Sequence, residues 1–489
     1  MIRAMLAAAA AIWLVNRLRR VAEDHDIHPI AHSTRARRTV EMAKLGARRG
    51  TDRTITSARA QFGSDERRRR LVAELELREA RDVVDSLGRM KGALMKLGQM
   101  ASYLDEGLPE PMRLALAELR SDAPPMSGDL ALTEIETSLG QPLLSLFEHV
   151  DPQPLAAASI GQVHKAITRD GREVAVKVQY PGIADAIAAD LDNTETLANM
   201  LGFIFPGLDP TSLVEELRAR ILEELDYEQE ARNQRAFADY YRGHPYIWVP
   251  DVIDELSTHN VLTTEFVNGK TFDEAFEMSQ QDRDRYAEIL YRFVFRSLNR
   301  QLAFNGDPHP GNYLLADDGR LAFLDFGLVK YFDPAEVDQF TALIQAMIYG
   351  DHHRFRQEAE RVQVLRPGAP FSDDDVFEWF SSYYELILED RELTITPEYS
   401  GQLLRKTFDA KANAILKHTN VPPTFALIQR INLGLFSILA KLNATANWRQ
   451  ISEELWVWTD AEPSTPIGEH EATWLAAHPR PANSEGPKG

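Results

Sequence analysis

GDPHPGN at residues 306–312 and LDFG at residues 324–327 are the two stretches of the sequence that decide the fold. They place Asp307, then Asn312 five positions later, then Asp325 in one order. Phosphoryl transfer uses these residue types, because a carboxylate positions the attacking oxygen while carboxylate and amide oxygens hold magnesium against the phosphates. The alternative is that residues 306–312 are only a turn, since Pro, Gly and Asn favour turns. The two stretches together favour Asp307 as the catalytic base and Asn312 and Asp325 as magnesium ligands, with one strand expected between them.

A lysine suited to contact phosphates lies upstream, in the stretch REVAVKV at residues 172–178. Apolar residues alternate there, which predicts a half-buried strand. The segment resembles the Val-Ala-Ile-Lys signature of protein kinases, whose lysine contacts the α- and β-phosphates of ATP. A strand lysine can also be merely solvated, but Lys177 follows a second kinase-like segment. We therefore expect Lys177 to bind the phosphates.

The segment before this strand, AAASIGQV at residues 156–163, occupies the place of the glycine-rich loop of protein kinases. Alanine has less backbone freedom than glycine, so this loop should hold the nucleotide differently from an ordinary kinase loop. The alternative is the start of a short Ala-rich helix. The nucleotide-binding residues expected here are Ala156, Ala157, Ala158, Ser159, Gly161 and Val163.

Taken with KLGQ at residues 96–99 and ELDY at residues 224–227, these motifs resemble the signatures of the UbiB/AarF family of atypical kinases. The resemblance covers roughly residues 75–350. It implies an α+β, bilobal protein-kinase-like fold with an N-terminal helical extension and a mostly helical C-lobe. It also implies ATP and magnesium as cofactors, ATPase or unorthodox kinase activity, and a role in isoprenoid-quinone metabolism.

The same resemblance assigns roles to residues whose local pattern alone favours a solvated helix face. Glu230 would pair with Lys177 and so act as the glutamate that positions the lysine in kinases. Lys96 and Gln99 share a helix face, because they are three residues apart. In the family pattern this face meets an acidic segment over the site where a peptide would otherwise dock. The regulatory residues implied are Lys96, Gln99, Glu224 and Asp226.

Two usual kinase features are missing. Asn305 and Gly306 replace the His-Arg pair that precedes the catalytic Asp, so a phosphorylated activation loop would lack its arginine partner. DPAE at residues 333–336 predicts a helix start soon after Gly327. A normal activation segment does not fit, which argues against an enzyme that phosphorylates protein chains.

Charge is distributed unevenly along the 489 residues. The net charge is −20, but residues 1–70 contain 16 Lys and Arg against 7 Asp and Glu, a net of +9, which leaves −29 for the rest. The acidic body argues against nucleic acid as a partner. There is no cysteine, which excludes disulfides and zinc–thiolate sites. Use of ATP favours a cytoplasmic protein.

The apolar run at residues 4–15 is too short to span a bilayer, which needs about 20 residues. It fits a helix that lies in the membrane interface, with Trp13 among the headgroups and arginines on anionic lipid. A signal-peptide core and a helix packed on the kinase body are the alternatives. The interface helix predicts a protein that is peripheral to an anionic membrane.

The expected organisation has five parts. A basic extension at 1–70 is followed by a helical extension at 71–135, an N-lobe at 136–270, a C-lobe at 271–460 and a disordered tail at 461–489. The tail is rich in Pro, Gly, Ser and Glu, a composition typical of disorder. Glu265 and Val267 lie in the expected hinge, where backbone groups would meet adenine.

Two classes of function remain open. The first is an active ATPase, or a kinase of a small or lipid-like substrate, which binds ATP and ADP and acts with a lipid or quinone-like ligand or with quinone-biosynthesis proteins. The second is a nucleotide-binding regulatory pseudoenzyme. An antibiotic-type phosphotransferase would share the pattern from Asp307 to Asn312, but it would not explain KLGQ at residues 96–99.

Overall fold

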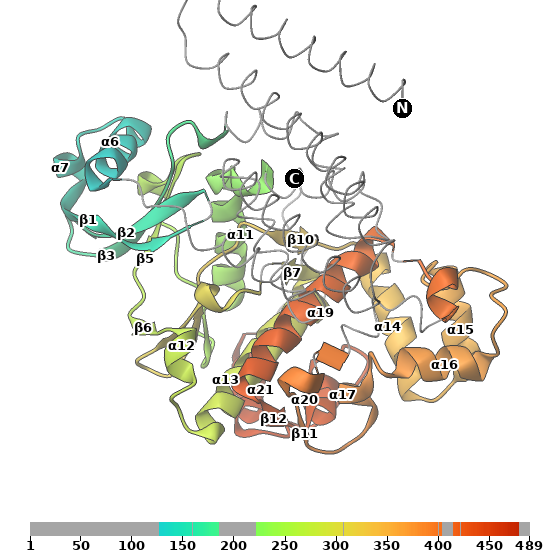
Figure 1. The fold of residues 1–489 in the computed structure, drawn as a ribbon. Helices are drawn as coiled ribbons and strands as arrows, with labels where there is room; N and C mark the ends of the chain where they lie inside the picture. The colour runs from blue at the N-terminus through green and yellow to red at the C-terminus, as the bar shows by residue number, and fades with distance from the viewer. Residues whose placement is uncertain are drawn as a thin grey trace, which may run out of the picture. The chain divides into compact units, whose positions relative to one another are not determined.

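The computed structural model describes residues 127–158, 160–184, 222–306, 308–399, 401–402, 414–420 and 422–478 (Figure 1). The predicted basic extension, the Lys96–Gln99 motif, Ser159 and Asp307 lie outside these residues. The described residues include the N-lobe sheet and the helical C-lobe that the sequence predicts.

The N-lobe is an antiparallel sheet with the strand order β1-β2-β3-β5. Two helices precede it, and the elements are α6 (Gly128–Leu139), α7 (Leu143–Leu146), β1 (Phe147–Ala157), β2 (Gly161–Thr168), β3 (Glu173–Gln179) and β5 (Val261–Glu265). Val174, Val176 and Val178 alternate along β3 and are fully buried in one cluster with Ala131 and Ile135 of α6. The predicted half-buried strand at 172–178 is confirmed. Lys177 lies on the face opposite to these valines.

Helix α11 (Tyr227–Tyr240) runs from this sheet into the rest of the protein. Asp226 caps its N-terminus, because its side chain accepts the backbone N–H of Gln229 at 3.0 Å. Near the other end the Phe237 ring lies 5.8 Å from Phe293 and 5.0 Å from Phe326, measured between centroids. The helix therefore connects the sheet with the helical lobe.

A second sheet, with the order β4-β9-β8-β6, carries the predicted metal motif. Apart from β5, the elements from Ile247 to Tyr331 are β4 (Ile247–Trp248), η1 (Asp254–Leu256), β6 (Gly269–Lys270), α12 (Phe272–Ala275), α13 (Gln280–Arg296), η2 (Ser297–Gln301), β7 (Ala303–Asn305), η3 (Pro310–Asn312), β8 (Tyr313–Ala316), β9 (Leu321–Phe323) and β10 (Val329–Tyr331), and η1 packs on the N-lobe sheet. The expectation of one strand between Asn312 and Asp325 is wrong. A hairpin of two strands, β8 and β9, lies there, and Gly319 takes the left-handed conformation (φ 84°) in its turn.

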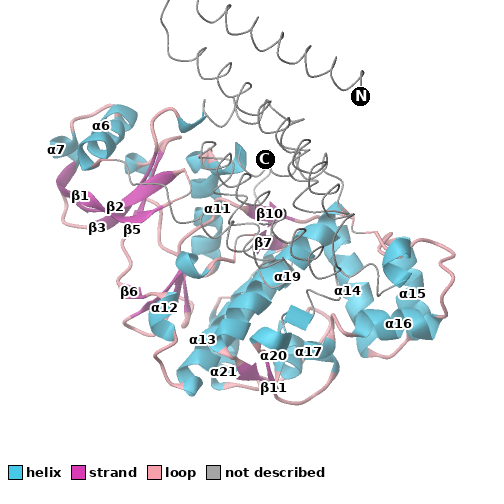
Figure 2. Ribbon diagram, viewed as in Figure 1, coloured by secondary structure: helices cyan, strands magenta, loops and turns pink. Residues whose placement is uncertain are grey.

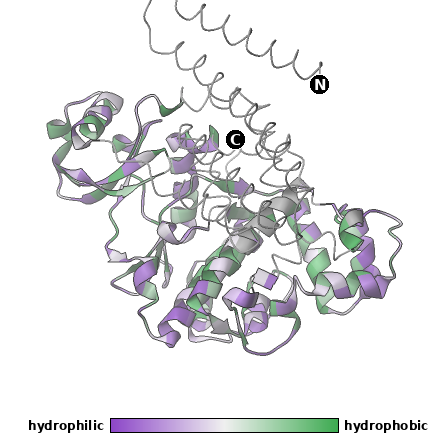
Figure 3. Cartoon of the chain, in the orientation of Figure 1, coloured by the Kyte–Doolittle hydropathy of each residue, from purple (hydrophilic) through white to green (hydrophobic). Residues whose placement is uncertain are grey.

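The C-lobe is mainly helical, as predicted (Figure 2). Its elements after β10 are α14 (Pro334–Ile348), α15 (His352–Arg361), α16 (Asp373–Ser381), α17 (Glu385–Leu388), β11 (Leu393–Thr394), η4 (Ala414–His418), α19 (Pro423–Leu442), β12 (Thr445–Ala446), α20 (Trp448–Leu455) and α21 (Pro466–Ala477). Hydrophobic and hydrophilic residues alternate along α14 to α16, the pattern of amphipathic helices that bury one face (Figure 3).

The expectation of a disordered tail at 461–489 is wrong for residues 466–477, which form α21. Thr465 caps this helix and Pro466 occupies its first turn, where a missing N–H costs nothing. Ile467, Glu471 and Trp474 follow at helical spacing and are each at most 5% exposed. The composition suggested disorder because it does not reveal that these three side chains share one buried face.

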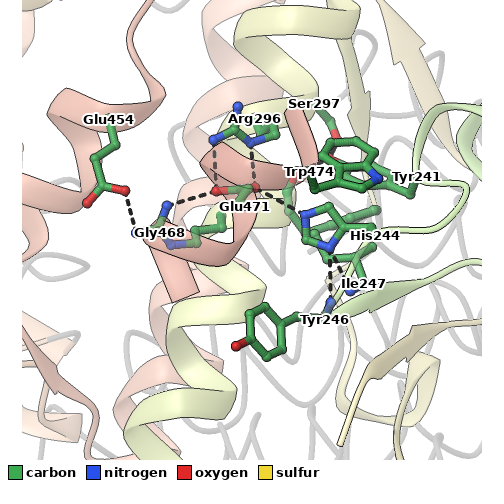
Figure 4. Close-up of polar contacts among 12 residues, drawn as sticks. Tyr241, His244, Tyr246, Ile247, Arg296, Ser297, Glu454, Gly468, Glu471 and Trp474 are labelled. Carbon is green, nitrogen blue, oxygen red and sulfur yellow. Dashed lines mark hydrogen bonds and ion pairs between the residues drawn. The ribbon is translucent and has the colours of Figure 1, made fainter. Parts of the chain in front are cut away.

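A buried ion cluster holds α21 against α13 (Figure 4). The Glu471 carboxylate accepts hydrogen bonds from Arg292 Nη1 at 2.8 Å and from Arg296 Nε at 2.5 Å. Its Oε1 also lies 3.3 Å from His244 Nε2. Burial would raise the pKa of Glu471, but Arg296 and Arg292 together hold that pKa well below its usual range.

The Glu471→Gln variant should lose much of its stability at neutral pH, by about 3–5 kcal/mol, because the buried Arg296 would lose its carboxylate partner and Arg292 would keep only Glu288 and Glu454. The folded-state pKa is lowered, so the ionised carboxylate stabilises the fold above the unfolded value of 4.5, and this contribution is lost as the pH falls below it. The difference in unfolding free energy between the wild type and the variant should therefore narrow below about pH 4.5.

Denaturant unfolding at several pH values measures this difference, with Glu469→Gln on the exposed face of α21 as the matched control. A loss of stability equal to that of the control would contradict the role given to the cluster.

Candidate functional site

Lys177 joins two acidic residues from different parts of the chain. Its Nζ donates to both carboxylate oxygens of Glu230 on α11, at 2.7 and 2.9 Å, and to Asp325 Oδ2 at 3.4 Å. The Lys177 side chain is 18% exposed, that of Glu230 2% and that of Asp325 31%. The ion pair expected between Glu230 and Lys177 is present, and Asp325 points toward the same amine.

The charges of this cluster alter the pKa values of its members. Burial alone would lower the pKa of Lys177, but the carboxylates of Asp325 and Glu230 outweigh burial and raise that pKa well above its ordinary value. Burial raises the pKa of Glu230 to about 7, and the charge of Asp325 adds to this rise while Lys177 opposes it. The lysine therefore stays charged and available to an anionic ligand at neutral pH.

Backbone and side-chain contacts fix the segment that contains Asp325. Asp325 Oδ1 accepts the backbone N–H of Gly327 at 3.0 Å, and Asn305 Nδ2 donates to the Asp325 carbonyl at 2.7 Å. Phe326 is fully buried, and Asn233 Nδ2 of α11 donates to its carbonyl at 3.0 Å. The position of α11 and the position of Asp325 are thus coupled through direct contacts.

The β8–β9 hairpin brings Asn312 close in space to the Asp325 segment. Tyr313 pairs with Phe323, and the Leu324 backbone N–H donates to the Asn312 carbonyl at 3.0 Å. A carboxylate and an amide at one end of a hairpin provide the hard oxygen donors that magnesium prefers. Among the described residues there is no group of three His, Cys, Asp or Glu side chains placed to hold a metal. The donor set of Asn312 and Asp325 fits a magnesium ion that is also held by phosphates.

The alanine-rich segment is a strand and a tight turn, so the alternative of a helix start is wrong. Ala156 and Ala157 end β1 and pair with Val163 and Gln162 of β2. The Ala158 backbone N–H donates to the Gly161 carbonyl at 2.8 Å and closes the turn.

The turn joins β1 to β2, and β2 is the neighbour of the lysine strand β3 in the sheet. Val163 pairs with Lys177 in the sheet register. Gly161 is required by close packing, because a Cβ atom there would lie within 2.9 Å of the Val178 carbonyl carbon. The segment therefore lies beside the end of β3 that follows Lys177.

The expected hinge begins within β5 rather than after it. Glu265 is the last residue of β5, and its carboxylate and backbone N–H both bond the backbone of Asp251, at 3.0 and 2.9 Å. The Phe266 backbone N–H donates to the Glu173 carbonyl at 3.1 Å. Val267 lies in the connection to β6 and is buried. These contacts fix the segment, and they leave the assignment of Glu265 and Val267 to adenine binding as a prediction.

The two acidic residues of ELDY have different surroundings. Asp226 is the N-cap of α11, and it also lies 3.8 Å from Arg232 and 3.6 Å from His259. Glu224 lies close enough to the cluster for its charge to contribute to the raised pKa of Glu230. Their predicted contact with Lys96 and Gln99 falls outside the described residues.

Sequence reasoning missed three residues that support the site. Asn233 and Phe237 hold the Asp325–Gly327 segment from α11, and the Tyr227 ring lies 5.0 Å from Lys177 Nζ. Their spacing in the sequence could have identified Asn233 and Phe237, since both share one helix face with Glu230.

The predicted helix start soon after Gly327 is confirmed. β10 pairs with β7, and α14 begins at Pro334 with a capping box formed by Asp333 and Glu336. Residues 328–333 alone separate Gly327 from this helix.

No described helix is long and apolar enough to cross a membrane.

Replacing Lys177 by methionine should raise the pKa of Glu230 above its value of about 7, because Lys177 lowers that pKa. Titration of the carboxyl carbons of ¹³C-labelled glutamate by NMR measures this pKa, and a Glu230→Gln spectrum identifies the signal. Lys165→Met, which removes a lysine from the neighbouring strand β2, is the control. An unchanged pKa in Lys177→Met would show that the two side chains do not interact as described.

Comparisons with known proteins show which chains this sequence resembles. A family model described as the ABC1 atypical kinase-like domain matches residues 118–359. The chain is 31% identical over 382 residues to the mitochondrial atypical kinase coq-8 of Caenorhabditis elegans, which covers 76% of this chain and 50% of that protein. It is 28% identical over 382 residues to the mitochondrial atypical kinase COQ8B of Rattus norvegicus, with 77% and 71% covered. The chain thus spans half to about seven tenths of the length of these curated relatives.

A solved structure is also similar to this chain. The complex of Rv3197 from Mycobacterium tuberculosis with erythromycin matches with a TM-score of 0.59 and 32% sequence identity, over 81% of this chain and 99% of that one. With its kinase-like sheet, its Lys177–Glu230 pair and these matches, the chain belongs to the ABC1 atypical kinase-like family, also known as UbiB.

Proposed function

We propose that this protein is an ATP- and magnesium-dependent enzyme, an ATPase or a phosphotransferase that acts on a small or lipid-like molecule. The observation that carries the proposal is the position of Lys177 between Glu230 and Asp325. In kinases such a lysine binds the phosphates, the glutamate orients it and the aspartate holds magnesium. Bound magnesium would neutralise charge on the phosphates.

Each residue of the proposed site has its own role. Lys177 binds and orients the phosphates, Asn312 and Asp325 hold the metal, and Asp307 accepts the proton of the attacking water or hydroxyl. The turn at Ala158–Gly161 covers the nucleotide, and its alanines limit how the backbone approaches the phosphates. The hinge residues Glu265 and Val267 lie where adenine would bind.

A protein substrate is disfavoured by the short segment between Gly327 and α14, because it leaves no room for the platform on which kinases bind peptides. We propose instead a lipid or quinone-like ligand and a role in isoprenoid-quinone or other lipid metabolism, with quinone-biosynthesis proteins as partners. Two relatives are named as mitochondrial atypical kinases of the COQ8 type, which supports this context. The basic N-terminal residues would attach the protein to an anionic membrane from the cytoplasmic side.

The Asp307→Asn variant should keep its affinity for ADP and lose about 10²–10⁴-fold in the rate of ATP hydrolysis, because a general base contributes on that order. Phosphate release by the full chain with magnesium and ATP measures the rate, and calorimetric titration measures ADP affinity. Asp317→Asn, in the exposed turn between β8 and β9, is the matched control.

An unchanged rate in Asp307→Asn would remove Asp307 from the mechanism. Absence of hydrolysis in the wild type, with ADP still bound, would favour the regulatory pseudoenzyme.

A further inference from the structure

The helical lobe contains a partly open cavity of about 270 Å³ between α13, α14, α15, α16, α17, α19 and α20. In another protein an engineered apolar cavity of about 150 Å³ binds benzene, so this volume has room for a two-ring molecule. Its wall is mostly aromatic and aliphatic, with Phe340, Ile344, Phe380, Tyr383, Phe425 and Phe436 among the lining residues. None of the described lining residues is Asp, Glu, Lys, Arg or His. A charged ligand group would lose its hydration there without gaining a partner.

One polar atom in the wall needs a hydrogen-bond donor. The hydroxyl groups of Tyr291 and Ser452, which also line the cavity, bond each other at 2.7 Å, and Ser452 donates to the Trp448 carbonyl at 2.6 Å. Asn432 Oδ1 is buried and has no hydrogen-bond partner among the described residues. Such an acceptor is costly when left unpaired, so a ligand that donates an N–H or O–H to it would bind more tightly than one of the same shape without a donor.

The cavity also touches the segment that leads to the proposed catalytic loop. Leu298 and Asn299 line it, and both belong to the π-helical turn η2 at the end of α13. π-Helical turns are rare in proteins, and those that occur are frequently found at functional sites. The chain then passes Leu302, whose φ of 53° is left-handed, and enters β7, where Asn305 holds the Asp325 carbonyl. A molecule in the cavity would contact this turn directly.

We propose that this cavity is a binding site for a neutral, ring-containing apolar molecule that donates one hydrogen bond to Asn432 Oδ1. The site is separate from the nucleotide cleft, since Lys177, Glu230 and Asp325 do not line it. The proposal does not depend on the proposed enzymatic activity.

Indole tests the proposal directly, because it is neutral, has two rings and carries a single N–H donor. Indene has the same shape without the donor, and indole-5-carboxylate adds a charge. Calorimetric titration of the full chain should show saturable binding of one indole per protein. Binding of indene should be weaker by about five- to tenfold, the loss expected for one hydrogen bond, and indole-5-carboxylate should not bind.

Two variants and one control variant locate the site. Thr341→Phe places a ring in the cavity from the half-buried face of α14 and should abolish binding of indole. Thr133→Phe makes the same change at an exposed position of α6 and should have no effect. Asn432→Leu should weaken indole about five- to tenfold and leave indene unchanged, which tests the acceptor even if Thr341→Phe fails to fold. Circular dichroism and thermal unfolding show whether each variant retains its fold.

Amide hydrogen exchange of the full chain with saturating indole provides the position independently. Exchange across Ser297–Gln301 should slow, because the molecule packs on that turn. The proposal is overturned if the full chain shows no saturable binding of indole, if Asn432→Leu binds indole and indene as the wild type does, or if protection appears only outside the cavity wall.

Discussion

The ion pair between Lys177 and Glu230 is the interaction on which the rest of this structure depends. A buried carboxylate is costly unless a counter-charge and hydrogen bonds accompany it, and Glu230 is 2% exposed. Because the lysine is on β3 and the glutamate on α11, the pair fixes the sheet against the helix. Asp325, which follows β9, completes the cluster, so the Lys177 amine contacts side chains from two other segments of the chain.

Contacts with α21 and η2 hold the C-terminal end of α11. The Tyr241 ring stacks on Trp474 of α21 with an interplanar angle of 11°, and its hydroxyl bonds Ser297 Oγ at 2.7 Å. Trp474 Nε1 donates to the Arg242 carbonyl at 3.2 Å. Glu471 in turn binds α21 to α13 through the buried arginines. With both ends fixed, α11 presents Glu230 to Lys177 in a preformed arrangement.

Local patterns predicted those parts of the fold that depend on local physics. Alternating valines identified β3, and the capping residues Asp333 and Glu336 identified the start of α14. The order of Lys177, Asp307, Asn312 and Asp325 suggested a phosphate and metal site, and three of these residues lie in the described part of the chain. The pairing of Glu230 with Lys177 came only from the family resemblance, because an acidic helix normally faces solvent.

Two of the errors share one physical cause, which is that burial is decided by distant partners. The composition of residues 461–489 predicts disorder, because nothing nearby in the sequence shows that Glu471 meets Arg292 and Arg296. The same holds for Asn233, whose amide bonds a carbonyl far along the chain. The second strand of the β8–β9 hairpin was missed because only three residues, 321–323, form β9.

The central claim is that Lys177, Asn312 and Asp325 form one nucleotide and metal site. Crystals of the full chain grown with ADP and Mn²⁺, which replaces magnesium and scatters anomalously, test it most directly. We predict an anomalous peak within coordinating distance of both Asn312 and Asp325, with phosphate oxygens at Lys177 Nζ. A nucleotide bound away from Lys177, or a metal peak that neither Asn312 nor Asp325 contacts, would contradict this claim.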